Sequence, residues 1–288
     1  MSSEELNTTT TDPNAPVPLS TLFCADDADV VIRTAGTRDF RAHKSFLSFV
    51  SPVFKGMFTI PQPPTDNPGT PPHIDVDESE KTWENILRTI YPMPNPVIDD
   101  LGSLESLLLA AKKYEMQPII DIYKTSLENQ AFARDEPLRL YAIACACGLD
   151  DQAKYAARNA DLLTVIKHSQ GGDLKGTTTA SYHRLITFLV EKDNELHSIF
   201  EGGWMSFGSS CTCLSGRQWV YEEARKGLRR PYSSMEEVYS KTLEKMSSCS
   251  RDHCSRRWDC PFADTCTKDF LQGLFRERER VCNNLIWE

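Results

Sequence analysis

The sequence has no hydrophobic run of the roughly 18 residues that would suggest a membrane-spanning helix. Its first residues, MSSEELNTTTTDPNAPVP, contain acidic side chains and no apolar core, so they cannot serve as a secretory signal. These absences lead us to expect a protein of the cytosol or nucleus that makes no membrane contact. What the sequence does have is a globular composition over 288 residues, with 40% hydrophobic and 25% charged residues, enough for a domain and an extension.

Motifs of catalytic and nucleotide-binding sites are also missing. There is no G-x-G-x-x-G or H-E-x-x-H, and GGDLKGT at 171–177 lacks the GK[ST] order of a phosphate loop. Asp29 and His43 could form a catalytic pair, but a His with an Asp fourteen positions earlier is more often structural, and no Ser or Cys nucleophile lies in a recognisable elbow. The sequence therefore predicts a protein that is not an enzyme and has no cofactor, apart from the zinc considered below.

Positive charge is scarce in the front two thirds of the chain. The net charge is −9, and residues 201–288 carry 14 Lys and Arg against 13 Asp and Glu, a net charge of +1, which leaves −10 for residues 1–200. An acidic surface repels phosphate backbones, so nucleic-acid binding is disfavoured unless the tail provides it.

The first ordered segment is predicted to be a hairpin followed by two short helices. Residues 28–33 and 38–43 have strand patterns around a turn at Gly36. Pro52 would break one long helix, but Ser51 is a good N-cap and proline is favoured at the first helical position. We therefore predict helices at about 44–50 and 52–58, whose apolar side chains, Phe46, Leu47, Val50, Val53, Phe54, Met57 and Phe58, require a core.

A proline-rich loop separates this part from three further helices. Residues 60–73 contain too many prolines for a helix or a central strand, and 74–76 form a short strand. An amphipathic helix then begins near 77–80, and a leucine-striped helix follows and ends at Pro118. IIDIYKTSLENQ at 119–130 predicts one more helix.

The order of these segments resembles the BTB/POZ domain, in which a helical cluster is flanked by a small sheet. The matching segments are ADVVI, FRAHK, SPVFKGMF, IDVDE, WENILRTIY, LLLAAKKYEM and QPIIDIYKTSL. Residues 139–160 are similar to the helical extension that often follows this domain, and the layout resembles single-BTB proteins common in fungi.

The resemblance implies an α+β fold, a BTB/POZ domain followed by a mostly α-helical C-terminal region. We divide the chain into a lead-in at 1–18, the BTB/POZ domain at 19–130, a helical extension at 131–200 and a Cys-rich helical region at 201–288. The lead-in is rich in Thr, Asn and Pro with almost nothing to bury, so we expect it to be disordered.

The resemblance also implies roles for the polar residues of the hairpin. An aspartate at the start of the first strand and a basic residue after the second lie near each other in BTB domains, and these are Asp29 and Lys44 in this chain. His43 is then a packed, hydrogen-bonded histidine at the end of the hairpin. The second helix supplies the candidate interaction residues Phe54, Met57 and Phe58.

Seven of the ten cysteines lie beyond residue 200. One interpretation is structural zinc held by Cys211 or Cys213 with Cys249, Cys254 and His253, although the gaps of one, four and five residues fit poorly with the usual two to four. The other interpretation is small hydrophobic thiols in a helical region, since disulfides are disfavoured without a secretory route.

Two functions follow from these features. The first is a protein-protein interaction adaptor or scaffold, because the resemblance implies assembly of complexes, commonly with a cullin ubiquitin ligase. Loop 60–73 has no glutamate for the apolar-x-Glu motif of many cullin-binding members, and residues 19–27 leave little room for the exchanged helix of many homodimers, so the oligomeric state stays open. The second is a zinc-containing transcriptional or chromatin regulator whose tail binds nucleic acid or protein.

Overall fold

The chain divides into two compact units, Met1–Tyr123 and Lys124–Glu288. The computed structural model describes residues 18–35, 38–60, 71–162, 165–166, 174, 176–203, 222–227, 234–248, 263–285 and 287. Most of the predicted lead-in therefore lies outside the described residues. Within the part of the chain that is described, no helix combines the length and the apolar character needed to cross a membrane.

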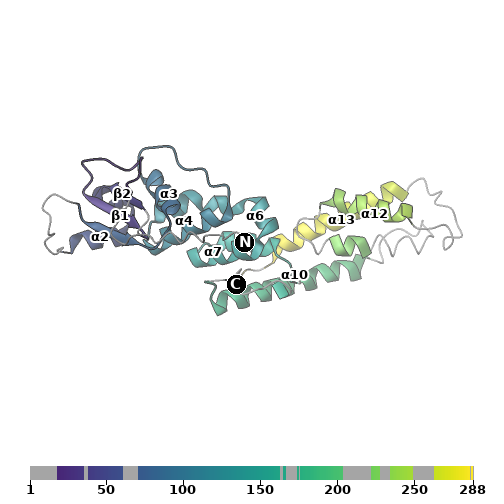
Figure 1. Ribbon diagram of the computed structural model, residues 1–288. Helices are drawn as coiled ribbons and strands as arrows, with labels where there is room; N and C mark the ends of the chain where they lie inside the picture. The colour runs from purple at the N-terminus through teal and green to yellow at the C-terminus, as the bar shows by residue number, and fades with distance from the viewer. Residues whose placement is uncertain are drawn as a thin grey trace, which may run out of the picture. The chain divides into compact units, whose positions relative to one another are not determined.

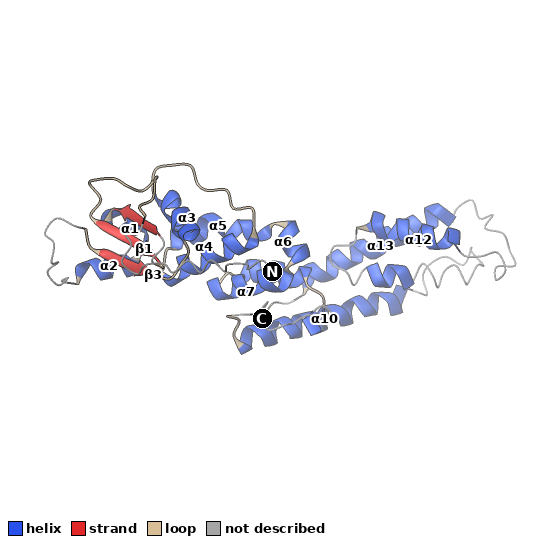
Figure 2. Cartoon of the chain, viewed as in Figure 1, coloured by secondary structure: helices blue, strands red, loops and turns tan. Residues whose placement is uncertain are grey.

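A small mixed sheet organises the first unit. Strands β1 (Val30–Thr34) and β2 (Arg38–Ala42) pair antiparallel, which confirms the predicted hairpin, and β3 (His73–Val76) joins β1 in parallel to give the order β2-β1-β3. The buried Ile32 lies opposite both Phe40 and Ile74, in the middle of the sheet. Figure 2 shows the three strands beside the helices of this unit.

Both edges of the sheet are restricted. On the outer side of β2, residues 18–23 run alongside the strand: Pro18 O accepts from Asp39 N–H at 2.9 Å, and Ser20 N–H donates to Asp39 O at 2.8 Å. The ring of Phe23 packs edge-on against Tyr91, with ring centroids 5.5 Å apart. On the other side, β3 is only four residues long and follows two prolines.

A tight corner after the hairpin joins two short helices, as the sequence predicts. Helix α1 (Lys44–Val50; labelled in Figure 2) is followed by Ser51, and α2 (Pro52–Thr59; labelled in Figure 1) begins at the next residue. The Ser51 hydroxyl accepts from Phe54 N–H at 3.1 Å and donates to Tyr114 O at 2.6 Å, and the side chain is fully buried. One hydroxyl thus caps α2 and ties the corner to a distant part of the chain.

Three more helices close the first unit. They are α3 (Glu80–Ile90), capped by Ser79, α4 (Leu101–Lys113), capped by Asp100, and α5 (Gln117–Tyr123). The prediction that Pro118 ends the leucine-striped helix is wrong: α4 stops five residues earlier, where Glu115 has a left-handed φ of 54°. Pro118 is instead tolerated in the first turn of α5, because the N–H that proline lacks has no partner there.

A partly buried carboxylate links α3 to the end of α4. Glu78 accepts hydrogen bonds from Trp83 Nε1 at 3.3 Å, Tyr114 Oη at 2.9 Å and Lys113 Nζ at 2.8 Å. Burial opposes ionisation of Glu78, but the hydrogen bonds, led by that of Lys113, outweigh it and hold its pKa below the ordinary value. The same carboxylate and burial raise the pKa of Tyr114 to about 12.

The second unit is helical wherever it is described. A 3₁₀ turn, η1 (Lys124–Glu128), replaces the end of the single helix predicted at 119–130. The helices that follow are α6 (Gln130–Asp135), α7 (Pro137–Cys147), α8 (Asp150–Asn159), α10 (Thr179–Gly203), α12 (Met235–Ser248) and α13 (Ala263–Asn284). Gly148, with φ of 73°, ends α7 in the left-handed conformation that favours glycine.

The described helices of the second unit form two packing regions. Helix α7 packs on α8, and the cluster Ala224, Val238, Leu271, Leu274 and Phe275 joins α12, α13 and the helical segment 222–227. Between these regions Lys192 of α10 is buried and donates to the carbonyls of Arg158 and Ala160 at the end of α8, at 2.9 and 2.6 Å. Burial lowers the pKa of this lysine to about 8.

Replacing Ser51 by Ala is expected to destabilise the protein by about 2 kcal/mol, because it removes an N-cap and leaves the buried Tyr114 carbonyl without its donor. Urea denaturation followed by circular dichroism measures the change. Ser45→Ala is the matched control, since Ser45 is exposed on α1 and should change the free energy of unfolding by less than about 0.5 kcal/mol. Equal effects of the two substitutions would contradict the role given to Ser51.

Glu78→Gln should lower stability at pH 7 by about 1–2 kcal/mol, since three donors lose a charged acceptor. The folded pKa of Glu78 lies below its unfolded value, so its contribution is present above the unfolded pKa and is lost as the pH falls through the folded pKa. The difference between variant and wild type should therefore shrink at acid pH. Denaturant titrations at pH 7 and pH 3.5 measure it, with Glu84→Gln as the control at a more exposed ion pair.

Candidate docking surface

Asp29 and Lys44 meet at the end of the hairpin through the backbone of Lys44. Asp29 Oδ1 accepts from Lys44 N–H at 2.7 Å, while His43, at the N-cap position of α1, makes no side-chain cap. Asp29 therefore caps α1 from outside the helix, and its negative charge lies at the positive end of the helix dipole. The ammonium group of Lys44 lies 5.7 Å from the ring centroid of Phe58.

His43 is enclosed by hydrogen bonds. Tyr91 Oη accepts the backbone N–H of His43 at 2.9 Å and lies 2.8 Å from its Nδ1, and His43 Nε2 lies 3.4 Å from Asp27 Oδ1. The network is satisfied when Tyr91 donates its proton to Nδ1 and the Nε2 proton faces Asp27. Burial, with the charges of Asp29 and Asp27, raises the pKa of Tyr91.

Both ring nitrogens of His43 have partners among the described residues. Its two ring nitrogens are taken by Tyr91 and Asp27, so neither accepts a proton from a serine or cysteine. The contacts of both side chains are structural. Asp29 caps the start of α1, and His43 fixes the end of β2 against Tyr91, the residue that follows α3.

The two helices of the corner expose a group of apolar side chains. Phe49 is 89% exposed, Ile60 62% and Phe46 37%, and Met57 and Phe58 are half-buried. We call the exposed and half-exposed residues of these helices, Lys44, Phe46, Phe49, Met57, Phe58 and Ile60, the α1–α2 surface. Apolar rings that are exposed in this number commonly mark an interaction site.

The structure separates the three predicted interaction residues. Met57 and Phe58 belong to the α1–α2 surface, whereas Phe54 is fully buried, with its ring stacked on Tyr114 at 5.0 Å and edge-on to Trp83 at 5.9 Å. Phe54 therefore holds α2 against the core and cannot contact a partner. Along α2, the buried Phe54 therefore holds the helix against the core, and Met57 and Phe58 face outward.

Phe46 and Phe49 are the residues that sequence reasoning missed as surface groups. Leu47 and Val50 fill the core as predicted, but Phe46 stacks on Tyr91 with centroids 4.5 Å apart and stays partly exposed. Four of the seven residues of α1 are apolar, and only Leu47 and Val50 among them are buried, so the apolar side of the helix is wider than the core covers. That pattern was the available signal for this surface.

The candidate zinc ligands cannot be placed in this way. Cys211, Cys213, Cys249, Cys254 and His253 lie outside the described residues, so the proposed metal site stays a prediction. Within the described ranges, no three His, Cys, Asp or Glu side chains gather in a way that could hold a metal ion.

A small sheet, a helical cluster and an exposed apolar corner define a protein-protein interaction module. Residues 19–131 match the family model of the BTB/POZ domain. Residues 19–131 are therefore a BTB/POZ domain, and the fold is α+β with a helical C-terminal region, as the resemblance implied. None of the curated proteins with which the chain was compared matches it.

Asp29→Ala should destabilise the first unit by about 1 kcal/mol, since α1 loses the side-chain acceptor of the Lys44 N–H and a favourable charge at its N-terminus. Lys44→Met is the informative control: it keeps that N–H, so it should change stability by less than about 0.5 kcal/mol. Thermal and urea unfolding of both variants measure the effects. If Lys44→Met were the more damaging change, a side-chain ion pair rather than a backbone cap would join these residues.

Proposed function

We propose that this protein is a non-enzymatic adaptor that binds a cullin ubiquitin ligase through its BTB/POZ domain and brings other proteins to it. BTB/POZ domains are in general protein interaction modules, which supports the adaptor role. The exposed aromatic face of the corner is the observation that carries the proposal, and Phe49, at 89% exposure, is its clearest element.

The chemistry of the α1–α2 surface suits a stable contact. Transferring a phenylalanine side chain from water into an interface contributes about 1.5–3 kcal/mol, and aromatic residues dominate measured binding energies. Phe49, Phe46 and Met57 together would supply several kcal/mol of binding free energy before the costs of association. Lys44 beside Phe58 adds a charged rim that fixes the orientation of the partner.

Contacts within the domain hold the corner in place. Ser51 ties the start of α2 to the end of α4, Asp29 holds the start of α1, and Phe54 anchors α2 in the core. Ordering flexible side chains and loops on binding costs free energy, so a surface that is already held in place binds more tightly for the same contacts.

The proposal places the protein in the cytosol or nucleus, where cullin ligases act. It requires no second copy of the chain, because the α1–α2 surface and the residues that support it all come from one domain. It requires no metal either, so zinc binding by the tail cysteines would be an additional property.

Met57→Asp and Phe49→Asp are expected to abolish co-purification of the tagged protein with a cullin, because each puts a charge into an apolar contact at a cost of several kcal/mol. The change is read by immunoblotting or mass spectrometry of purified complexes. Both residues are at least partly exposed, so both variants should keep the unfolding midpoint of the wild type.

Val97→Asp is the matched control for this experiment. Val97 is 84% exposed in the same unit but lies outside α1 and α2, so the same substitution should leave cullin association unchanged. Retained association in both the Met57 and Phe49 variants would remove the α1–α2 surface as the contact. Absence of any cullin from the wild-type complex would remove the ligase proposal as a whole.

A further inference from the structure

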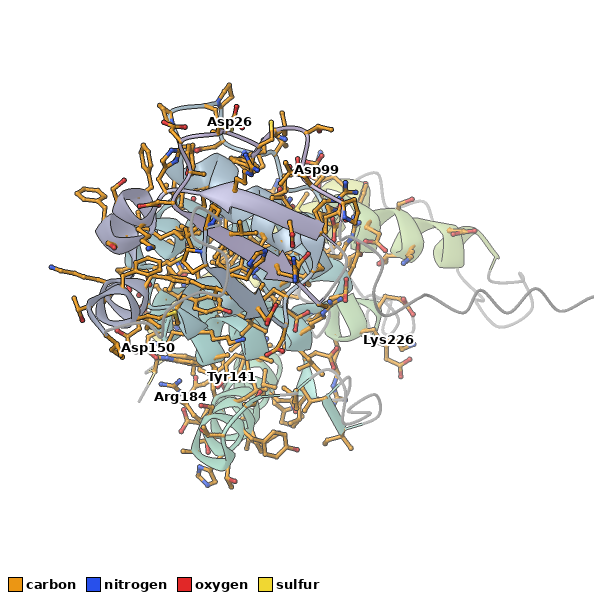
Figure 3. The ribbon with its side chains drawn as sticks, turned by 60° about the vertical axis from the view of Figure 1, so that its left-hand side comes forward. Asp26, Asp99, Tyr141, Asp150, Arg184 and Lys226 are labelled. Carbon is orange, nitrogen blue, oxygen red and sulfur yellow. The ribbon has the colours of Figure 1, made fainter. Side chains whose placement is uncertain are left out.

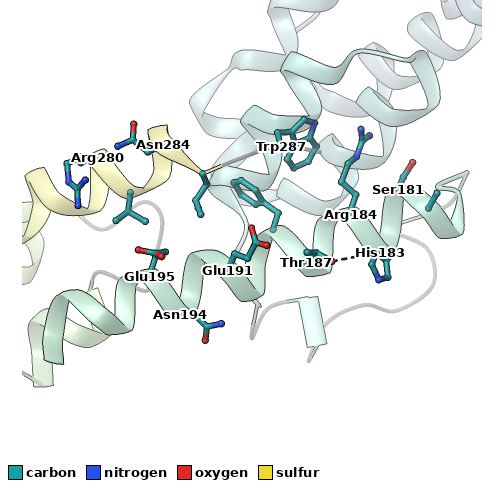
Figure 4. Close-up of a pocket in the computed structure, with 14 residues that line it drawn as sticks. Ser181, His183, Arg184, Thr187, Glu191, Asn194, Glu195, Arg280, Asn284 and Trp287 are labelled. Atoms are coloured by element: carbon teal, nitrogen blue, oxygen red, sulfur yellow. Dashed lines mark hydrogen bonds between the residues drawn. The ribbon is translucent and has the colours of Figure 1, made fainter. Parts of the chain in front are cut away.

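The second unit contains a groove that the adaptor proposal does not use. It has a cavity volume of about 1080 Å³ and lies between α10 and the end of α13, with Trp287 at one end (Figure 4). Its walls combine apolar side chains in the middle, Phe188, Val281 and Leu285, with polar groups toward the ends.

One end of the groove holds two hydrogen-bond donors that lack an acceptor. Arg184 Nε and Trp287 Nε1 are both buried, and neither has a partner within the described structure. The Arg184 guanidinium lies 4.9 Å over the Trp287 ring, which packs edge-on against Phe188 at 5.2 Å. The Nη1 of Arg184 already donates to Asp150 Oδ1 at 3.1 Å, so only its Nε lacks an acceptor, and Arg184 also lies next to Tyr141 (Figure 3).

Buried donors without partners are costly, and most native structures satisfy them with protein, water or a ligand. The position of these two donors on the wall of a groove favours a ligand. The group that satisfies them must be an acceptor, such as a carboxylate.

The other end of the groove is acidic. Glu191 and Glu195 are exposed, lie one helical turn apart, and face α13, whereas Asn194 points away from it (Figure 4). Arg280, across the groove, forms its ion pair with Glu277 of its own helix and is attracted by Glu195 only at longer range. Like charges one turn apart destabilise a helix, so this arrangement favours a cationic ligand.

The length of the groove sets the size of its ligand. Arg184 and Glu195 are eleven residues apart on α10, and at about 1.5 Å per residue they are separated by roughly 16 Å along the helix axis. An extended peptide advances about 3.3 Å per residue, so about five residues bridge the two ends. Phosphate chains fit poorly, since the two glutamates repel them.

We propose that this groove binds a short extended segment of a partner protein, with a lysine or arginine against Glu191 and Glu195, apolar residues in the middle, and an aspartate or glutamate against Arg184 and Trp287. The opposite charges at the two ends also determine the direction in which the segment lies. The inference concerns the second unit alone and does not depend on cullin binding.

Fluorescence anisotropy with the purified full chain tests the proposal. The probe is a pool of fluorescein-labelled pentapeptides with Lys or Arg at one end, three apolar positions and Asp or Glu at the other. The comparison pool has acidic residues at both ends. We expect saturable binding of the first pool, at least tenfold tighter than that of the second at low salt, and weaker binding as salt is added.

Three variants make the test specific. Glu191→Gln combined with Glu195→Gln should weaken binding about tenfold, since a charge-assisted contact is lost. Trp287→Phe should weaken it about threefold to tenfold without lowering the unfolding midpoint, because the donor it removes has no partner in the free protein. Glu236→Gln, at an exposed glutamate of α12, should bind like the wild type.

Equal binding of the two pools, or no binding of the first, would overturn the proposal. Unchanged affinity in the double glutamine variant would do the same, and this variant changes only exposed side chains, so it stays informative if Trp287→Phe fails to fold. These measurements contain no cullin, so their failure is distinct from failure of the adaptor proposal.

Discussion

The buried hydroxyl of Ser51 is the contact on which the first unit depends. It stands where Pro52 forbids a continuous helix, and it satisfies one backbone donor of α2 and one backbone acceptor at the end of α4. Because that acceptor belongs to Tyr114, the same residue that bonds Glu78 and stacks on Phe54, the corner, the carboxylate network and the aromatic core are held together. The exposed side of α1 and α2 keeps a fixed shape as a result.

Local patterns predicted most of the first unit. The hairpin, the break at Pro52 and the cap at Ser51 are each determined by neighbouring residues, so propensity and periodicity suffice to find them. Pro118 was misplaced because a proline fits both after a helix and in the first turn of the next, and only the left-handed Glu115 decides between these positions. The role of Asp29 follows only from the family resemblance, and its backbone donor, the N–H of Lys44, is identified only by three-dimensional contact.

The site residues that sequence reasoning missed have a common cause. Phe46 and Phe49 look like core residues because an apolar side chain carries no sign of which face of a short helix the core covers. The groove is harder still, since Arg184 and Trp287 are about a hundred positions apart and meet only when α10 and the end of the chain pack together. Neither residue belongs to a periodic stripe or a motif with a recognisable spacing.

The two proposed contact regions use different chemistry. The α1–α2 surface is apolar and aromatic with one cation at its rim, whereas the groove offers unsatisfied donors at one end and carboxylates at the other. Binding at the first depends mainly on removing apolar area from water, and at the second mainly on paired charges, which salt screens. The two kinds of binding therefore respond differently to ionic strength.

The edges of the sheet have a consequence for how partners are chosen. Residues 18–23 already occupy the hydrogen-bonding groups of β2, and β3 offers only a short edge behind Pro71 and Pro72. An incoming chain thus finds little backbone with which to extend the sheet, a mode of recognition that accepts almost any sequence. Partner proteins must therefore be recognised by the shape and charge of side chains. An acidic protein with exposed aromatic rings can then distinguish one partner from another without promoting aggregation through its sheet edges.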